Sequence, residues 1–370
     1  MPNRRDILKK GALALGVSAA LPSFGFNILT GRPRPESEMI LGHGDYQYKL
    51  VRDWAQMSST RNPILNCHEM VMDSKGRLIM IGDHTDNNIL IFDKSGKLLD
   101  YWGTSFPGGH GLTLSKEGEE DFLFLTDSGW FLDRHGKMIH HNGRVTKTTL
   151  DGHVLFDIGH PQTIGIYEPG DYFCPTEVAV GPNGDIYVAD GYGMDYIIQY
   201  NSKGEYIRHW GGKNPEDPNY KLANAHGVTI DYRDPDNPLV VCSSRGQNAY
   251  KFFTLDGKYV RTLKLPNMWV CRAVFDEQNL YAGVCWSKPE GGTFNWKEHT
   301  GFVTVLEGDQ VVSNPGGTAP NYEDGVLLPT YQLPEKPILH GHDVCIDEDK
   351  NLYVCQWNAN KTPPLKLERI

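Results

Sequence analysis

Two stretches of the chain decide the fold: HEMVMDSKGRLIMIGDHTDNNILIFDKSGKLLDYWG, residues 68–103, and TEVAVGPNGDIYVADGYGMDYIIQYNSKGEYIRHWG, residues 176–211. Each stretch opens with a polar residue and a run of alternating apolar residues, then passes through a glycine-bearing turn into a second such run. Each stretch then continues with a third run, a turn of Ser, Lys and Gly, and a fourth run that ends in Trp-Gly. Alternation with a period of two indicates strands, and the glycines suit tight hairpins.

Similar units begin at four other places: HGLTLSKEG at residue 110, HGVTIDYRD at 226, RAVFDEQNLYAGV at 272 and HDVCIDEDKNLYV at 342. Successive starts lie 42–70 residues apart, and no helical periodicity separates them. Six units of up to four strands predict an all-β fold, a six-bladed β-propeller with four antiparallel strands in each blade. Residues 46–56, YQYKLVRDWAQ, are expected to supply the strand that closes the ring.

The blade pattern resembles that of NHL-type six-bladed propellers over nearly the whole chain after about residue 42. Residues 45–370 are therefore predicted to form a single propeller, preceded by a linker at 27–44. Residues 1–26, MPNRRDILKKGALALGVSAALPSFGF, resemble a twin-arginine export signal, with Arg4-Arg5 before a short apolar run. That run is too short to span a bilayer, so we expect a periplasmic or secreted protein that is not membrane-spanning.

Charge and cysteine usage narrow the choice of partners. The net charge is −10, with no block of like charges, which argues against a nucleic-acid partner and leaves a small-molecule, peptide or sugar substrate. The seven cysteines include no CxxC pair, so a zinc site built of thiolates has no support. Most lie in apolar strands and are expected to be small core residues, with one or two disulfides left open, as is the oligomeric state.

The first strand of each propeller blade lines the central channel, so the residues that open the six units should meet at one rim. Those residues are His68, His110, Thr176, His226, Arg272 and His342. Three or four converging imidazoles predict a site for a divalent transition metal, with zinc expected first. A hydrogen-bonded polar role is the alternative for each histidine, and a structural calcium ion is kept as a second cofactor alternative.

With these residues in place, the chain resembles the peptidyl-α-hydroxyglycine α-amidating lyases, a family of six-bladed propellers whose axial zinc is held by three histidines. The motifs GHGLTL, AHGVTI and GHDVCID carry the resemblance and imply His110, His226 and His342 as ligands. The family's aspartate after the last ligand matches Asp343. Its tyrosine near the metal matches Tyr192 in ADGYG, and its fourth-blade arginine matches Arg245 in SSRGQN.

The resemblance and the chemistry of the side chains assign two roles beside the metal. Tyr192 is the expected base, because a phenol near a metal ionises below its usual pKa, and its alternative is a turn aromatic that packs on the blade. Asp343 is expected to orient a ligand imidazole, or else to cap the start of its strand.

Two arginines are expected to hold an anionic group of the substrate. Arg245 and Arg272 would face the pocket and pair with a carboxylate or sulfate. The alternative for Arg272 is an internal salt bridge with Glu177. Glu69 and Glu177 directly follow a unit start, so strand alternation predicts that they point away from the axis.

Four departures from the family pattern put the shared substrate in doubt. The family's first-blade arginine has no match, and IGDHTDN offers His84 and Asp83 instead. His340 replaces a methionine two places before the last ligand, and His68 stands where the family has no ligand. A disulfide cysteine after the tyrosine is replaced by Gly193. His84 and His340 are expected to line the substrate pocket.

These observations predict an exported metal-dependent lyase that acts at an oxygen-bearing carbon of an unknown substrate. One alternative is a propeller hydrolase or lactonase, but those enzymes use an acidic axial calcium site, and the predicted axial set is rich in histidine. The other alternative is a non-catalytic propeller that binds a protein or glycan partner on one face.

Overall fold

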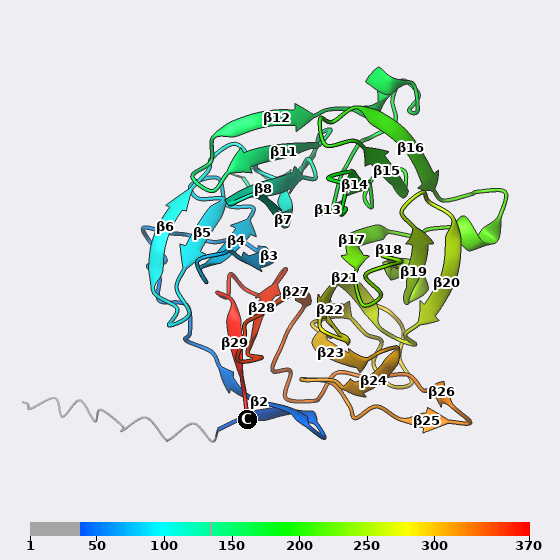
Figure 1. Ribbon diagram of the computed structural model, residues 1–370. Coiled ribbons are helices and arrows are strands. Elements are labelled where there is room, and N and C mark those ends of the chain that lie inside the picture. Colours follow the sequence, from blue (N-terminus) through cyan, green and yellow to red (C-terminus); the bar gives the residue numbers. More distant parts are fainter. Residues whose placement is uncertain (1–37, 134) are drawn as a thin grey trace, which may run out of the picture. The chain divides into compact units, whose positions relative to one another are not determined.

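The computed structural model describes residues 38–370 apart from residue 134. Its sheets form six blades arranged in a ring around a central channel (Figure 1). The predicted six-bladed propeller of antiparallel four-stranded blades is confirmed. The predicted export signal at 1–26 and residues 27–37 of the predicted linker lie outside the described residues.

Each blade runs from an inner strand at the channel to an outer strand at the rim. The first three blades are β3 (Cys67–Met72), β4 (Leu78–Gly82), β5 (Ile89–Phe92) and β6 (Leu98–Trp102); β7 (Gly109–Glu117), β8 (Glu120–Asp127), β11 (Arg144–Thr149) and β12 (Val154–Ile158); and β13 (Glu177–Val180), β14 (Ile186–Ala189), β15 (Tyr196–Tyr200) and β16 (Tyr206–Gly211). The last three are β17 (Ala225–Asp231), β18 (Leu239–Ser244), β19 (Ala249–Thr254) and β20 (Tyr259–Lys264); β21 (Trp269–Asp276), β22 (Asn279–Trp286), β23 (Phe302–Glu307) and β24 (Gln310–Ser313); and β27 (Gly341–Ile346), β28 (Leu352–Gln356), β29 (Leu365–Arg369), β2 (Tyr46–Val51) and β1 (Ile40–His43).

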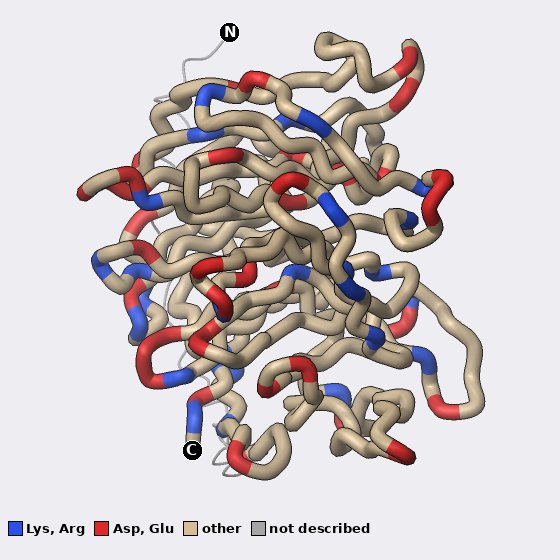
Figure 2. Tube along the Cα trace, turned by 45° about the vertical axis from the view of Figure 1, so that its right-hand side comes forward, with Lys and Arg blue, Asp and Glu red and all other residues tan. Residues whose placement is uncertain are grey.

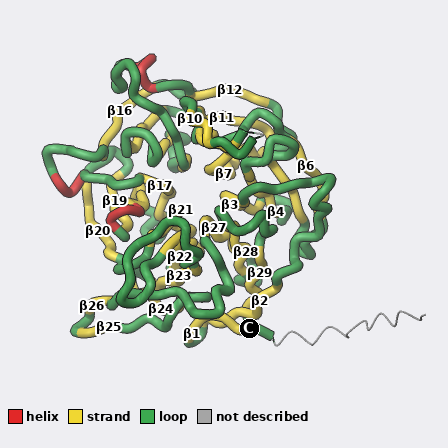
Figure 3. The backbone as a smooth tube through the Cα atoms, turned by 180° about the vertical axis from the view of Figure 1, so that it is seen from behind, coloured by secondary structure: helices red, strands yellow, loops and turns green. Residues whose placement is uncertain are grey.

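Small elements decorate the loops between these strands. They are the hairpin of β9 (Trp130–Leu132) and β10 (Met138–His140), the hairpin of β25 (Tyr322–Glu323) and β26 (Val326–Leu327), and the 3₁₀ helices η1 (Pro161–Ile164), η2 (Pro218–Tyr220) and η3 (Arg245–Gln247). Seen from the side opposite to Figure 1, connecting segments lie in front of the blades (Figure 3).

The ring is closed by strands from both ends of the propeller, as the sequence predicts. β2 pairs antiparallel with β29, and Leu50 faces Leu367 across the junction. β1 then pairs with β2 and adds a fifth strand to this sheet, although it lies within the stretch predicted as a linker. Pairing both ends in one blade protects edges that would otherwise stay open.

The recurring Trp-Gly at the end of a blade has a packing role. The rings of Trp102 and Trp210 each cover a turn glycine of the next blade, Gly152 and Gly257 respectively. A Cβ on Gly152 would lie 2.8 Å from Trp102, and a Cβ on Gly257 would lie 2.7 Å from Trp210. Both glycines also have positive φ, +90° and +84°, a region that favours glycine. The repeated Trp-Gly motif therefore packs one blade against the next.

Apolar side chains fill the interfaces between consecutive blades. Between the first two blades, for example, Ile81 and Ile89 pack with Leu112 and Leu125, all of them fully buried. Corresponding clusters join the other neighbours around the ring. Stacking blade on blade gives each sheet a partner for both of its faces, so the core is a ring of layers rather than a single centre.

The inner strands share an irregularity near their first residues. In β3, β7, β17, β21 and β27 the pairing register shifts there, as between Cys67 and Glu69. A β-bulge leaves a residue unpaired and re-aims the side chains beside it. In β3, β21 and β27 two consecutive side chains, such as His68 and Glu69, therefore both reach the channel.

Charged residues lie mainly on the outer strands and turns, where basic and acidic positions are interspersed (Figure 2). Within residues 38–370, the structure contains no helix with the length and apolar character needed to cross a membrane.

Candidate metal centre

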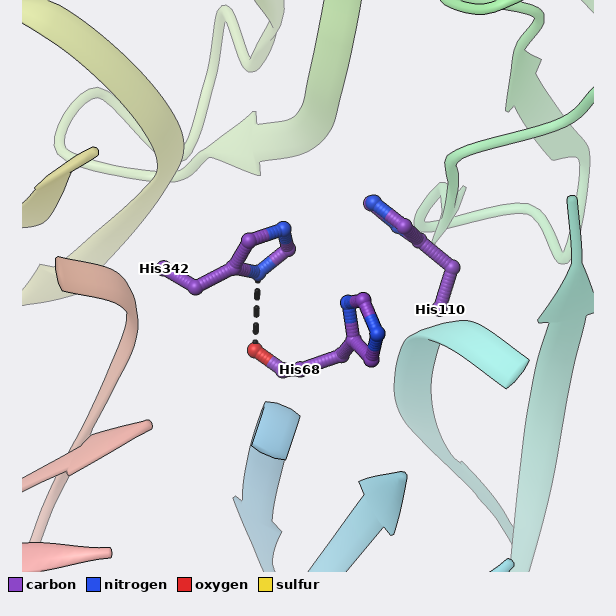
Figure 4. Close-up of side chains that lie close together, drawn as sticks. All are labelled: His68, His110 and His342. Atoms are coloured by element: carbon purple, nitrogen blue, oxygen red, sulfur yellow. Dashed lines mark hydrogen bonds between the residues drawn. The ribbon is translucent and has the colours of Figure 1, made fainter. Parts of the chain in front are cut away.

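Four imidazoles meet on the channel axis at the starts of the inner strands. Neighbouring ring centroids lie 4.8–4.9 Å apart, and all four side chains are buried. They belong to His68 on β3, His110 on β7, His226 on β17 and His342 on β27. Donor atoms of His68, His110 and His342 lie within 4.8 Å of one another (Figure 4). The four predicted metal ligands are thus brought together from four blades.

Hydrogen bonds engage one nitrogen each of His226 and His342 and both nitrogens of His110. His110 Nδ1 lies 2.8 Å from the carbonyl oxygen of Thr176, His342 Nδ1 lies 2.9 Å from that of His68, and His226 Nε2 lies 3.2 Å from the hydroxyl of Tyr192. The bond from His342 to His68 is drawn in Figure 4. Such contacts set the tautomer and aim the other nitrogen.

The remaining nitrogens are buried without a partner in three of the rings. Among the described residues, His68 Nδ1, His226 Nδ1 and His342 Nε2 make no hydrogen bond. Burial lowers the pKa of His110, His226 and His342 well below the ordinary value, and charges on neighbouring groups lower it further. Neutral imidazoles with free lone pairs are the form that binds a transition metal, so this donor set fits the metal that the sequence predicts.

The blade-five member of this ring differs from the sequence prediction. Pairing of Ala273 with Ala282 matches pairing of Val228 with Cys242, so Cys271, not Arg272, is the counterpart of His226. Donor atoms of His226, Cys271 and His342 form a second group within 4.8 Å. Aligning CRAVFD with HGVTID by their apolar residues would have revealed this position.

Cys271 lies in a polarised setting. Its Sγ is 3.8 Å from Nη1 of Arg245 and 3.8 Å from the carbonyl oxygen of Gly341. Burial raises the pKa of the Cys271 thiol, but the hydrogen bond with Cys285 and the charge of Arg245 outweigh it and leave the pKa below its ordinary value. All seven cysteines are free and buried, so the disulfides left open by the sequence are absent from the described residues.

Tyr192 stands directly over the imidazoles. Its hydroxyl lies 3.1 Å from Nε2 of His110, 3.2 Å from Nε2 of His226 and 3.5 Å from Nη2 of Arg245. Burial raises the pKa of Tyr192, whereas Arg245 acts to lower it. The phenol therefore meets a proton-accepting nitrogen on one side and a permanent cation on the other.

The turn that carries Tyr192 is held by Asp190. The Asp190 carboxylate accepts hydrogen bonds from the backbone N–H groups of Cys174 and Met194, at 2.6 and 2.7 Å, and from the hydroxyl of Tyr167. A Cβ at Gly193 would lie 2.2 Å from this carboxylate. Close packing of glycine on Asp190 thus replaces the cysteine found in the family pattern.

Aromatic side chains that the sequence did not reveal surround the tyrosine and the arginine. Trp130 stacks on Tyr192 with centroids 5.0 Å apart and on His140 at 4.4 Å. Arg245 lies over the ring of Trp286 at 5.0 Å, and its Nε donates to Oδ1 of Asn224 at 2.6 Å. The hairpin β9–β10 therefore brings Trp130 to the site, a placement that no sequence period signals.

A charged layer lies one residue further along the inner strands. Arg272 pairs with Asp343 at 2.7 Å, Glu69 at 3.3 Å and Glu177 at 3.8 Å, and all four side chains are buried. The expectation that Glu69 and Glu177 point away from the axis is wrong. The bulge in β3 turns Glu69 inward, and Glu177 is the first residue of β13, so alternation starts there.

The guanidinium of Arg272 is engaged in this internal network and does not face the imidazoles. Besides Asp343, its guanidinium donates to the carbonyl oxygens of Leu112 at 2.8 Å and Met70 at 3.3 Å. The ion-pair alternative, not substrate binding, matches these contacts. They also fill the axial oxygen cage that a structural calcium ion would need, so the residues do not fit that ion unless the guanidinium leaves.

Asp343 likewise belongs to the charged layer. Its carboxylate binds Arg272 and accepts the backbone N–H of Met70 at 2.9 Å. None of its hydrogen bonds in the described chain reaches an imidazole, so the orienting role expected of Asp343 has no support here. Asp83 is the carboxylate that does reach one, with Oδ2 3.4 Å from Nε2 of His68.

The two remaining predicted residues lie apart from the ring. Nδ1 of His340 contacts the carbonyl oxygen of Cys285 at 3.0 Å, and the ring packs on Trp286 and Trp357, each 5.7 Å away. Burial lowers the pKa of His340 to about 4. His84 sits in a turn, where its Nδ1 accepts the backbone N–H of Asp86 at 3.2 Å.

A separate cavity of about 670 Å³ opens at the other end of the channel. The far ends of the inner strands line it, including Met72, Ile230 and Ile346. Arg272 contributes to its lining, so the charged layer stands between this cavity and the imidazoles. The cavity therefore does not mark the metal-binding end of the channel.

Sequence comparison finds relatives among the peptide-amidating enzymes. Peptidyl-α-hydroxyglycine α-amidating lyase 1 of Drosophila melanogaster is 33% identical over 311 residues, which are 78% of this chain and 49% of the relative. Peptidyl-glycine α-amidating monooxygenase B of Xenopus laevis is 24% identical over 358 residues, 91% of this chain and 38% of the relative. The chain thus spans about half or less of the length of these relatives.

Among solved structures, a streptogramin B lyase superimposes with a TM-score of 0.52 at 14% identity, covering 90% of this chain and 99% of that one. This likeness shows the fold alone. No family model matches the chain. The chain is an NHL-type six-bladed propeller that resembles the amidating lyases, and its axial histidines form a candidate metal centre.

Proposed function

We propose that the chain is an exported, metal-dependent lyase that cleaves at an oxygen-bearing carbon, as the named relatives suggest. One observation carries the proposal: buried neutral imidazoles with unpaired nitrogens converge beneath a phenol that also contacts an arginine. Structural burial alone gives no reason to leave three ring nitrogens without partners, because each costs free energy.

A divalent transition metal, zinc first among them, supplies Lewis acidity to a substrate oxygen when bound. His110 and His342 would hold it, with His226 and His68 as the further ligands. The export part of the proposal rests on the twin-arginine-like segment at residues 1–26. Replacing Arg4 and Arg5 with lysine should leave the protein in the cytoplasm, as measured by cell fractionation.

Tyr192 is the residue placed to move a proton. For a substrate with an α-hydroxyglycine end, the hydroxyl proton leaves, a carbon–oxygen double bond forms, the carbon–nitrogen bond breaks and the nitrogen takes a proton. Tyr192 would accept the first proton, with Arg245 placed to offset the burial that raises the pKa of the phenol. Arg245 could also pair with a carboxylate of the substrate. Its guanidinium already contacts Asn224, Cys271 and Trp286.

The test begins with elemental analysis of the folded, exported protein purified without added metal, which should contain about one transition-metal ion per chain. A peptide ending in α-hydroxyglycine should then yield the peptide amide and glyoxylate. Tyr192→Phe should lower kcat by about 10²–10⁴-fold with the metal retained. Tyr232→Phe, at an exposed tyrosine lining the cavity of the other mouth, is the matched control and should leave kcat unchanged.

A folded propeller without any transition metal would overturn the proposal and favour the non-catalytic alternative that binds a protein or glycan. Metal content near one ion per chain with no cleavage of this peptide would direct the search to other hydroxylated substrates. The lactonase alternative loses support because Arg272 neutralises the axial carboxylates that a calcium site would use.

A further inference from the structure

Cys271 occupies a ring position that imidazoles fill in the neighbouring blades. It stands between His226 of blade four and His342 of blade six, at the corresponding step of its inner strand. The register shift in β21 near Val270 is of the same kind as the shifts that aim the histidines. The fold therefore delivers this thiol to the axis in the way it delivers the imidazoles.

The donor atoms of these three residues form a compact group. They lie within 4.8 Å of one another, and all three residues are buried. Both histidines keep a nitrogen without a hydrogen-bond partner, Nδ1 of His226 and Nε2 of His342, while the other nitrogen of each ring is engaged. Two unpaired nitrogens beside a sulfur are a ready set of ligands for a transition metal.

We propose that Cys271 is a further ligand of the bound metal, beside His226 and His342; this inference rests on the proposed metal site. On binding, the Cys271 S–H bond breaks, a sulfur–metal bond forms and the proton leaves to solvent. No oxidant or reductant is involved.

The surroundings suit a bound thiolate. The guanidinium of Arg245, 3.8 Å from Sγ, places a permanent positive charge beside the sulfur. His342 belongs to both donor groups and has one free nitrogen, so the two groups meet at a single ion. A sulfur ligand favours softer ions such as cobalt, copper or zinc over magnesium or calcium.

The experiment uses Co²⁺ as the probe, added to the full chain after metal removal. Bound cobalt shows visible ligand-field bands with any ligands, whereas a sulfur-to-cobalt charge-transfer band in the near ultraviolet requires thiolate. Wild type should show both features at one ion per chain. Cys271→Ser should lose the charge-transfer band and keep the visible bands, and Cys285→Ser, which changes the adjacent thiol, should keep both.

The outcomes separate this inference from the proposed function. Visible bands without a charge-transfer band in wild type would overturn the ligand role of Cys271 and leave a nitrogen site standing. No cobalt binding at all would overturn both proposals. Loss of the band only in Cys285→Ser would assign the sulfur to Cys285 and overturn the inference. Where Cys271→Ser does not fold, a wild-type charge-transfer band that persists in Cys285→Ser supports the inference.

Discussion

Two layers of the channel, one residue apart along the inner strands, use buried polar groups in opposite ways. In the charged layer, Arg272 is surrounded by Asp343, Glu69 and Glu177 and donates to two backbone carbonyls. Among the four imidazoles of the metal centre, three nitrogens have no partner within the described residues. The same strand starts thus build a largely paired polar network, in which Glu177 Oε2 lacks a hydrogen bond, and an open one.

The difference separates stability from function. A buried cation with three carboxylates and two carbonyls has its bonding capacity nearly filled, so nothing external is required. Buried nitrogens that stay unpaired cost free energy, and a bound ion would repay that cost. Substitutions in the charged layer should therefore destabilise the fold. Substitutions among the four axial histidines should remove the metal while the fold persists.

The largest effect is expected from Arg272→Met. This change leaves three buried carboxylates without their cation, which should lower the free energy of unfolding by about 3–5 kcal/mol. Urea titration of the metal-free protein measures the loss. Arg261→Met, which breaks the partly exposed pair with Asp309 at 2.6 Å, is the control and should cost only about 0–1 kcal/mol. Equal losses in the two variants would refute the closed-network interpretation.

The next effect distinguishes two histidines of the same stretch, ILHGHDVCID at residues 338–347. His342 belongs to both donor groups, so His342→Ala should weaken metal binding by more than about 100-fold, beyond the typical effect of losing an outer contact. His340 instead packs among tryptophans, so His340→Ala should retain the metal. Equilibrium dialysis with Zn²⁺ measures both. Retention of full zinc affinity by His342→Ala would show that the four axial histidines are not the metal site.

Much of the metal centre could be predicted because the blades of a propeller surround one axis, so equivalent positions of the repeat lie close together. The recurrence of His110, His226 and His342 at strand starts implied convergence without any knowledge of distances. The bulges could not be predicted, because they depend on pairing between strands, and they decide which of two consecutive residues faces the axis. That gap misplaced blade five by one residue, hid Cys271 and assigned Arg272 to a substrate anion ahead of the internal salt bridge with Glu177.

A smaller effect tests whether His68 belongs to the metal site. Asp83 engages Nε2 of His68 and leaves Nδ1 free, as a carboxylate does for a metal-binding imidazole. Asp83→Asn should therefore weaken zinc binding by about 10–100-fold in equilibrium dialysis. Asp100→Asn, at an exposed position of β6, serves as the control. Unchanged affinity in Asp83→Asn would confine the site to the other three histidines and Cys271.

The last effect is a pH dependence of stability to which Asp343 of the charged layer contributes. Burial raises the pKa of Asp343 to about 7, although Arg272 opposes the shift. The unfolded chain ionises this carboxyl near its ordinary pKa of about 3.9, so between about pH 4 and pH 7 the folded state binds the extra proton. Stability from this group is therefore lost as pH rises through that window, by at most about 1.4 kcal/mol per pH unit.

Comparing metal-free wild type with Asp343→Asn isolates this slope, because the histidines titrate in both proteins. The free energy of unfolding of wild type minus that of the variant should fall from pH 4 to pH 7. Asp256→Asn is the control, since a hydrogen bond from Thr254 lowers the pKa of that exposed carboxyl to about 2 and places its effect below the window. A flat difference for Asp343→Asn would mean that Arg272 keeps this carboxylate ionised at every pH in that range.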